Sequence, residues 1–397
     1  MRFFYLDPGL IDDIGHHANY CRYIVGELRA RGIETFVFGH DQVIGRLNSE
    51  LGVSPLFRIH TYRKLIWLSD FELFARCTFE ELERLPGIQA SDVVYMVSTT
   101  PVQLMAVTQW LQHLPADRRP TVVVEIGDTG LVASNGQAGL TFAMPDARHN
   151  PRPTLFRHAA DRLPAIARLH FITFDRTLSE AVNFLLARPV RTLPLPYRAV
   201  TALRNRAGAK PIVVAILGHQ RGEKGLLHLP EIAATLLRAR PDVRLQIQNV
   251  APEGAPKAQQ ELRKLAANSD RLILYQQPAG KTLWPQLLEQ SDLILCPYYP
   301  NRYIASFSAV ASEALANGIP VVVPAATTLE KLLEECGRPG VAFDNFEPKL
   351  IVDATVHALN QFDRYATLAY NAAMKWPEKR GPTRLVDGLL ALVSPAG

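Results

Sequence analysis

The sequence has few cysteines and no long hydrophobic run. The four cysteines in 397 residues lie far apart and form no Cys-x-x-Cys pair. This spacing argues against a disulfide framework or a zinc site and favours a reducing cytoplasm. No apolar segment approaches the roughly 20 residues that span a bilayer, and the start, MRFFYLDPG, does not resemble a signal peptide. The sequence therefore predicts a cytoplasmic protein.

Patterns that commonly bind catalytic metals are also missing. The sequence contains no Asp-x-Asp and no His-x-x-x-His, and the adjacent pair Asp12 and Asp13 is more typical of a loop than of a cation site. If an anionic ligand binds here, side-chain cations and helix N-termini would have to balance its charge. We therefore predict that the protein uses no metal.

The positive charge is concentrated in one segment. The net charge is +5, but residues 151–210 carry eleven lysines and arginines against three acidic residues, which leaves a negative balance elsewhere. Two interpretations remain open: a solvated basic surface, or a face for an anionic partner such as the inner face of a membrane or a phosphate-bearing acceptor. Nucleic acid is a poorer candidate because the arginines lack interleaved aromatic residues.

Short apolar runs alternate with helical patterns along the whole chain, and 397 residues are enough for two domains. Runs that are apolar nearly throughout are typical of strands covered on both faces of a parallel sheet. Alternation of this kind in both halves predicts an α/β fold with two doubly wound domains. The predicted strands are 2–6, 34–39, 93–98, 121–126 and 169–174 in the first half, and 212–217, 243–249, 271–275, 292–297 and 320–323 in the second.

The predicted domain limits follow from breaks in this rhythm. A first domain spans residues 1–197, a linker of little apolar periodicity spans 198–210, and a second domain spans 211–376. After a break at Trp376-Pro377, residues 377–397 are expected to form a C-terminal helix that could cross back to the first domain. Ligands of such sheets bind beyond the carboxyl ends of the strands, so we expect the site in a cleft that the two domains face.

The segment AILGHQRGEKG, residues 215–225, has the features of an anion-binding loop. A strand is expected to end at Gly218, and Lys224-Gly225 to open a helix. The glycines allow the backbone close to a ligand, and a helix N-terminus favours an anion. Lys224 adds a point charge and Arg221 a planar fork, both suited to a diphosphate. The alternative is an ordinary strand-turn-helix with a solvated lysine.

A second candidate is Glu313 in the segment SFSAVASEALANGIPVVVP, residues 306–324. It lies on a helix predicted over 306–317. This helix and the Lys224 loop both follow strands of one sheet, so the two side chains could converge. A carboxylate there can accept both hydroxyls of a ribose while Lys224 and Arg221 hold phosphates. The alternative is a solvated helix glutamate.

The first half offers weaker candidates. In DPGLIDDIGHHANY, Gly15 allows close approach to a ligand, and His16 and His17 precede or open a helix expected over 18–31. A histidine there could bind a phosphate or act as a base near neutral pH, and the alternative is an ordinary loop histidine. Glu125 and Asp128 lie at the end of the strand at 121–126, and either could serve as a base. Asp128 could instead only cap a turn with Gly130.

The second half resembles the nucleotide-sugar domain of GT-B glycosyltransferases, especially the large retaining family 4. The family's Gly-Arg-x-x-x-x-Lys-Gly loop is matched by GHQRGEKG, with His219 in place of the arginine. Its ending Ala-x-Gly-x-Pro-Val-Val is matched by ANGIPVVV at 316–323, and LLEQSDLILCPYYP at 287–300 resembles the segment before the donor-sugar loop. The resemblance is good over residues 211–330 and weak over 1–170.

The resemblance implies two Rossmann-like domains and the transfer of a sugar from a nucleotide diphosphate sugar to a hydroxyl acceptor, without a metal and with retention of configuration. The acceptor would be a glycan, a lipid-linked sugar or a small molecule in polysaccharide or glycoconjugate biosynthesis, and no cofactor is implied besides the donor substrate. The family has an acid eight positions before Glu313, where this sequence has Ala305. The implied donor-binding residues are Gly15, Gly218, Arg221, Lys224, Gly225, Tyr303, Ser306, Phe307, Ser308 and Glu313.

Two alternatives belong to other functional classes. A nucleotide-sugar epimerase can use the same two-domain fold. A catalytically weakened partner subunit that only binds the nucleotide would explain Ala305. A dehydrogenase is disfavoured because no Gly-x-Gly-x-x-Gly follows the first strand of either half.

Overall fold

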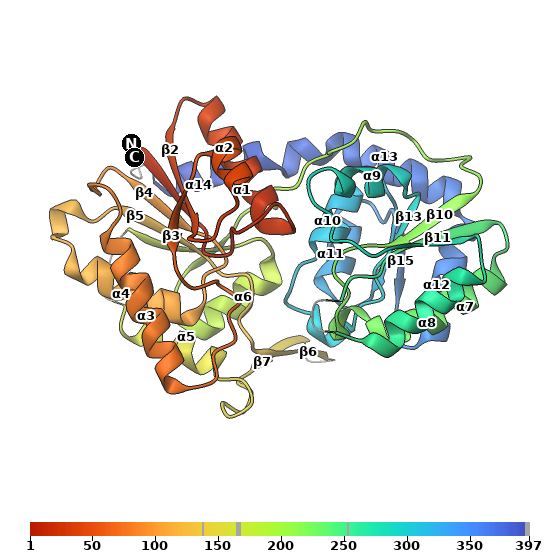
Figure 1. Ribbon diagram of the computed structural model, residues 1–397, viewed down its shortest axis with the longest axis horizontal. Coiled ribbons are helices and arrows are strands. Elements are labelled where there is room, and N and C mark those ends of the chain that lie inside the picture. The colour runs from red at the N-terminus through yellow and green to blue at the C-terminus, as the bar shows by residue number, and fades with distance from the viewer. Residues whose placement is uncertain (137–138, 164–167, 252–253, 394–397) are drawn as a thin grey trace. The chain divides into compact units, whose positions relative to one another are not determined.

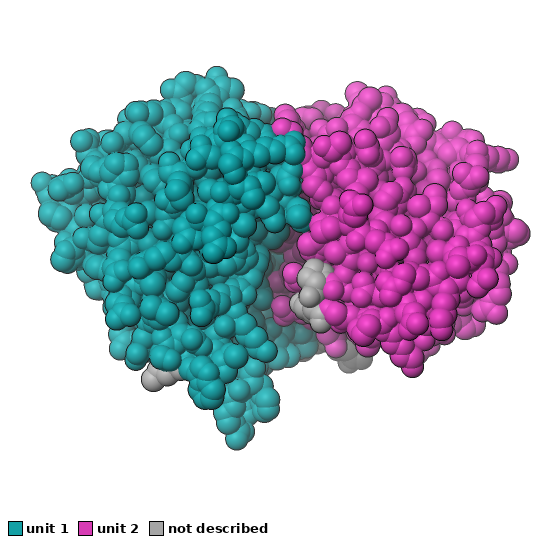
Figure 2. All heavy atoms as spheres, viewed as in Figure 1, with its two compact units in different colours: residues 1–196, 382–397 teal, residues 197–381 magenta. Residues whose placement is uncertain are grey.

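A computed structural model describes residues 1–136, 139–163, 168–251 and 254–393. Contacts divide the chain into two units, residues 1–196 with 382–397 and residues 197–381 (Figure 2). Residues 164–167 of the basic segment and 394–397 of the predicted C-terminal helix lie outside the described residues. Residues 198–210, predicted as a linker, are part of the second unit.

Unit 1 is built on a parallel sheet. Over the described residues its strand order is β3-β2-β1-β4-β5-β8-β9 (Figure 1). The strands are β1 (Arg2–Leu6), β2 (Glu34–His40), β3 (Val53–Phe57), β4 (Val93–Met96), β5 (Thr121–Glu125), β8 (Leu169–Thr173) and β9 (Val190–Thr192), with a separate hairpin of β6 (Val132–Gly136) and β7 (Gly139–Ala143). The helices are α1 (His16–Ala30), α2 (Gly45–Leu51), α3 (Leu68–Glu83), α4 (Pro101–His113), α5 (Arg152–Asp161), α6 (Arg176–Leu186) and α14 (Pro382–Ala391).

Unit 2 repeats this plan. Within the described part of the chain its parallel strands have the order β12-β11-β10-β13-β14-β15. The strands are β10 (Ile212–Ile216), β11 (Val243–Gln248), β12 (Leu272–Tyr275), β13 (Leu293–Leu295), β14 (Val321–Pro324) and β15 (Gly340–Phe343). The helices are α7 (Leu229–Ala239), α8 (Pro256–Ala267), α9 (Leu283–Gln290), α10 (Ala309–Ala316), α11 (Thr328–Glu335), α12 (Pro348–Asn360) and α13 (Phe362–Lys379).

The central strands are buried on both faces, as their apolar sequences predict. Every residue of β4 and β5 in unit 1 and of β14 in unit 2 is buried. Side chains alternate between the two faces of a strand, so helices must cover both sides of each sheet. The α/β fold with two doubly wound domains is therefore confirmed.

Each sheet has one point where the strand order reverses. In unit 1 it lies between β1 and β4, and in unit 2 between β10 and β13, because successive strands are added outwards in opposite directions from there. The loops after the two flanking strands diverge at such a point and leave a crevice at the carboxyl edge of the sheet, where ligands of open α/β sheets bind. Functional side chains are therefore expected at the carboxyl edge of each sheet, beside its reversal point.

The predicted helix break at Trp376-Pro377 is wrong. Helix α13 continues to Lys379 and includes Pro377, which has no N–H to donate to the carbonyl oxygen four residues earlier, so the helix continues without that one hydrogen bond. The chain turns at Gly381, whose φ of 99° suits glycine, and Pro382 begins α14. Helix α14 packs on α1 within unit 1, where Arg31 Nη1 donates to Asp387 at 2.8 Å.

The basic segment 151–210 is not one surface. It divides between the units after Pro196, and Arg206 is only 2% exposed. The Arg206 guanidinium donates to the carbonyl oxygens of Ser291, Asn317 and Gly318 at 2.8, 3.0 and 3.2 Å, so this charge serves to anchor the start of unit 2. In the described ranges, no helix is both long and apolar enough to cross a membrane.

Candidate functional site

The Gly218 turn brings Lys224 to the start of α10. The chain leaves β10 with a φ of 87° at Gly218, whose N–H donates to Gln248 Oε1 at 2.7 Å. A Cβ at Gly218 would lie 3.2 Å from Val310 Cγ2 and 3.4 Å from Lys224 Nζ. The Lys224 ammonium and the first turn of α10 therefore both border this glycine, beside the reversal point of the sheet.

Lys224 is held in a polar and aromatic environment. It is half-buried, and its Nζ lies 5.5 Å from the centre of the Tyr298 ring. Burial and the neighbouring Arg221 lower the pKa of Lys224. Two cations close to each other favour an anion between them, and Arg221 remains 45% exposed, with its guanidinium 3.9 Å from the Glu223 carboxylate.

Gly225 has a packing role. Its φ is 76°, and a Cβ there would lie 2.3 Å from the carbonyl oxygen of Pro297, after β13. Only glycine lets the Lys224 loop approach that backbone. The prediction that Lys224-Gly225 opens the helix is wrong: a short 3₁₀ turn, Leu226–His228, follows Gly225, and α7 begins at Leu229.

Glu313 is buried, which excludes the solvated helix glutamate. Helix α10 begins at Ala309 rather than at residue 306, and Glu313 is 3% exposed. The indole Nε1 of Trp284, on α9, donates to Glu313 Oε2 at 2.5 Å. Burial raises the pKa of Glu313 to about 7, although the Trp284 bond opposes this shift. The carboxyl group is thus oriented and sensitive to pH near neutrality.

The other predicted donor contacts lie in the segment that leads into α10. Tyr303 is 6% exposed and its ring stacks on Tyr298 at 4.7 Å. Ser308 caps α10, since its Oγ accepts from Ala311 N at 3.2 Å. The Ser306 carbonyl accepts from Thr328 Oγ1 at 2.5 Å, and Phe307 and Ala305 are half-buried. These contacts shape the loop, and a donor-binding role for its side chains stays a prediction.

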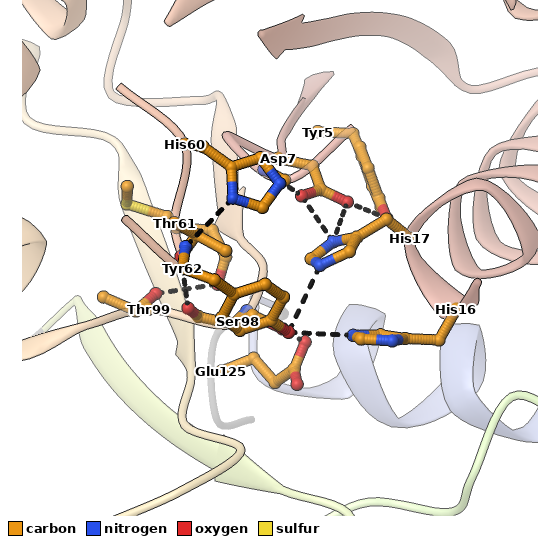
Figure 3. Close-up of polar contacts among 12 residues, drawn as sticks. Tyr5, Asp7, His16, His17, His60, Thr61, Tyr62, Ser98, Thr99 and Glu125 are labelled. Atoms are coloured by element: carbon orange, nitrogen blue, oxygen red, sulfur yellow. Dashed lines mark hydrogen bonds and ion pairs between the residues drawn. The ribbon is translucent and has the colours of Figure 1, made fainter. Parts of the chain in front are cut away.

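A second cluster of polar side chains lies at the reversal point of unit 1 (Figure 3). Asp7 follows β1, Ser98 follows β4 and Glu125 ends β5. Ser98 has a φ of 49°, which is uncommon for a residue other than glycine and often marks a functional loop. Gly15, with a φ of 79°, precedes His16 and His17 at the start of α1.

Asp7, the two histidines and Tyr62 form a continuous hydrogen-bonded chain. His17 Nδ1 lies 2.8 and 3.0 Å from the two carboxylate oxygens of Asp7. His17 Nε2 lies 3.2 Å from Tyr62 Oη, which in turn lies 3.1 Å from His16 Nε2 (Figure 3). Burial alone would lower the pKa of His17, but the Asp7 carboxylate outweighs it and raises that pKa.

Glu125 and Asp128 differ in environment. Glu125 is 1% exposed, accepts from Tyr95 Oη at 3.3 Å and Ser98 N at 3.4 Å, and has a pKa raised to about 7 by burial. Asp128 caps a turn, because Gly130 N donates to its Oδ1 at 3.0 Å, and it pairs with Arg152 at 3.3 Å. Glu125 is the better candidate acid or base, and a catalytic role for either stays a prediction.

Sequence reasoning missed Asp7 and Tyr62 as site residues. Asp7 could have been found, because it directly follows the first strand and lies at the carboxyl edge of the sheet. Tyr62 carries no such signal, since it is 45 residues from His17 and reaches the site from the loop after β3. Throughout the described ranges, no group of three or more His, Cys, Asp or Glu side chains is arranged to hold a metal ion.

Comparison with known proteins defines the class. Residues 202–375 match the family Glycosyl transferases group 1, and no protein of curated function matches the chain by sequence. Among solved structures, sucrose-phosphate synthase from Thermosynechococcus elongatus aligns with a TM-score of 0.68 at 14% identity, over 99% of this chain and 98% of that one. The shared architecture is the GT-B fold, with two Rossmann-like domains.

Two further structures have the same fold. HepE from Anabaena in complex with UDP aligns with a TM-score of 0.66 at 16% identity, over 98% of this chain and 99% of that one. WaaG, a glycosyltransferase involved in lipopolysaccharide biosynthesis, aligns with a TM-score of 0.62 at 15% identity over 100% of both chains. The match over residues 202–375 and this fold together make the chain similar to glycosyltransferases.

Proposed function

We propose that the enzyme transfers a sugar from a nucleotide diphosphate sugar to a hydroxyl group, with no metal and with retention of configuration. One observation carries the proposal: Lys224 and Glu313 follow the two strands that flank the reversal point of unit 2. A cation beside a helix N-terminus suits a diphosphate, and an oriented carboxylate suits a pair of ribose hydroxyls.

The chemistry requires stabilisation of a leaving diphosphate. As the acceptor oxygen bonds to the anomeric carbon, the bond from that carbon to the phosphate oxygen breaks, and its electron pair leaves with the nucleoside diphosphate. Lys224 and Arg221 are placed to offset the negative charge that develops there. Metal independence and retention rest on the resemblance of the Lys224 loop to family 4, and experiments must test both.

A ligand-binding screen tests the donor. We expect a nucleoside diphosphate to stabilise the protein with EDTA present, by about 2.7 kcal/mol at 100 times its dissociation constant. UDP and UDP-glucose are the first choices because HepE has been solved with UDP-glucose bound. A strict requirement for Mg²⁺ or Mn²⁺ would refute metal independence, and no stabilisation by any nucleotide would refute the donor class.

Product analysis tests the reaction. Transfer to a hydroxyl acceptor, with the anomeric configuration of the donor seen by NMR, is the expected result. An epimerised nucleotide sugar formed without an acceptor would instead identify an epimerase. Nucleotide binding with no turnover on any donor would favour a binding subunit, for which the replacement of the family's acid by Ala305 is the supporting feature.

We further propose that unit 1 contacts an anionic membrane at the inner face of the cell. In unit 1, the side chains of Arg157, Arg176 and Arg191 are exposed. Phe184 is 44% exposed, and the Arg157 guanidinium lies 5.8 Å from the centre of its ring. Arginines around an exposed aromatic ring combine attraction to anionic lipid with apolar insertion.

A further inference from the structure

The indole of Trp284 holds one of the two carboxyl oxygens of Glu313. Its Nε1, on α9, donates to Glu313 Oε2, on α10, at 2.5 Å. Within the described part of the chain, no hydrogen-bond donor reaches the second oxygen, Oε1. Oε1 is also not one of the fully enclosed polar atoms without a partner, so part of its surface stays accessible. The contact with Trp284 therefore leaves one oxygen held and the other open to a ligand.

Both helices are anchored within unit 2. The Leu287 carbonyl oxygen of α9 accepts from Gln246 Nε2 of β11 at 3.0 Å. At the end of α10, Asn317 Oδ1 accepts from Val200 N and Thr201 N at 2.9 and 3.1 Å. Since each helix is tied to its neighbours, the fold sets the place of the indole beside the carboxyl group, and the indole in turn sets the direction of that group.

We propose that Trp284 is a positioning residue of the donor site, which turns the open oxygen of Glu313 towards the ribose and gives the site a preference for a nucleotide with both ribose hydroxyls. This inference rests on the proposed binding of a nucleotide diphosphate sugar and deepens it. It adds a residue from α9 that acts on the ligand only through Glu313, and it involves unit 2 alone.

A carboxylate that is held at one oxygen can still accept two hydroxyl groups. The ionised group offers about four acceptor positions, and the Trp284 N–H occupies one of them, on Oε2. One ribose hydroxyl can donate to Oε1 and its neighbour to the remaining position on Oε2. Without the indole, the carboxyl group of Glu313 turns more freely, because the terminal torsion of a glutamate has broad minima, and the pair of acceptors is no longer fixed.

Protonation of Glu313 would abolish this arrangement. Burial raises the pKa of Glu313 to about 7, and the Trp284 bond opposes the shift. Among the described residues no charged side chain shifts this pKa, neither Lys224 and Arg221 of the neighbouring loop nor any on α9, α13 or β14, which adjoin α10. In the protonated form Oε2 accepts from the indole, so the proton lies on Oε1 and blocks acceptance from a hydroxyl. By favouring the ionised form, Trp284 extends ribose binding to lower pH.

The ratio of the dissociation constants of 2′-deoxy-UDP and UDP measures the preference for ribose. Both ligands carry the same diphosphate, so its titration and that of Lys224 cancel in the ratio. In calorimetry at pH 7 we expect a ratio of about ten for the wild type, because a hydrogen bond to a charged group is lost, and of about two for Trp284→Phe. The same measurement with 3′-deoxy-UDP tests the other hydroxyl.

The pH dependence of this ratio separates positioning from damage to the fold. In the wild type the ratio should rise as pH increases through about 7. In Trp284→Phe the rise should lie about one unit higher, because loss of the indole donor favours the protonated acid, and preference regained at pH 9 would show an intact site. Trp376→Phe is the matched control: it loses an indole hydrogen bond to the Tyr197 carbonyl oxygen elsewhere in unit 2 and should keep the wild-type ratio and midpoint. Glu313→Gln should have a low ratio at every pH.

The indole N–H signal of Trp284 in NMR tests the contact without a ligand and without the Trp284 variant. It should titrate with a midpoint of about pH 7 in the wild type and lose that titration in Glu313→Gln. A signal that does not titrate, or a wild-type ratio and midpoint in Trp284→Phe, would overturn the inference and leave glycosyl transfer intact. Failure of the wild type to bind UDP or UDP-glucose would instead refute the proposed function, and the ribose contact with it.

Discussion

Replacement of Glu313 by glutamine should have opposite effects on stability and on nucleotide binding. The change keeps the shape of the side chain and an oxygen for Trp284 Nε1, but removes the charge. A carboxyl group with a pKa of about 7 in the folded protein and an ordinary 4.5 when unfolded binds its proton more tightly in the folded state. Stability contributed by this group is therefore present at low pH and is lost as pH rises from 4.5 to 7.

The size of the effect follows from the shift in pKa. A pKa difference of one unit corresponds to about 1.4 kcal/mol, so the burial of ionised Glu313 costs about 3 kcal/mol above pH 7. Glu313→Gln avoids this cost. The free energy of unfolding of the variant, relative to that of the wild type, should therefore be higher at pH 8 than at pH 4.5 by up to about 3 kcal/mol. Hydrogen bonds to a charged acceptor contribute about 1.5–3 kcal/mol, so its affinity for UDP should fall about tenfold or more.

Urea unfolding at pH 4.5 and pH 8, and isothermal titration with UDP at pH 8, measure the two effects. Glu261→Gln, an exposed position on α8, is the matched control and should alter neither. A stability difference that is the same at both pH values would refute the buried, protonated state of Glu313. Wild-type affinity for UDP in Glu313→Gln would refute the ribose role, and the donor site would then rest on Lys224 and its loop.

Four further predictions concern other parts of the chain. Lys224→Ala should weaken UDP binding far more than uridine binding in calorimetry, because its ammonium is proposed to contact the phosphates; equal losses would contradict that role. Gly9→Ala should destabilise unit 1 by about 1–3 kcal/mol, because the added Cβ displaces the His17 ring, and an undisturbed His17 titration in NMR would refute the clash. Ala305→Glu should leave UDP affinity unchanged and alter that for UDP-glucose; parallel changes would show that position 305 does not face the sugar. Binding to vesicles should rise with anionic lipid and fall with salt, since exposed charges are screened beyond about 8–10 Å, and salt-insensitive activity without vesicle binding would leave a solvated basic surface.

The predicted strands and the unpredicted strands have different positions in the sheets. The predicted strands include all the central ones, whose residues are mostly apolar because helices cover both faces. In the two parallel sheets, the strands that were not predicted are β3, β9 and β15, which are edge strands with partly exposed residues, and β3 contains Pro55. The separate hairpin of β6 and β7 was not predicted either. An edge strand forms because a neighbour supplies hydrogen bonds, and its own sequence carries little of that signal.

The candidate site shows the same division. Lys224, Gly218 and Glu313 were predictable because each follows a strand of one parallel sheet, and local order along the chain determines which edge they reach. Their environments were not predictable. Trp284 contacts Glu313 across 29 positions of sequence, and Tyr62 joins His16 and His17 across 46 and 45. The sequence by itself determined the class of fold and the location of its loops. The packing of side chains from distant segments decided which groups are buried, which are paired and which have a shifted pKa. Burial and hydrogen bonding depend on neighbours that only the folded chain brings together.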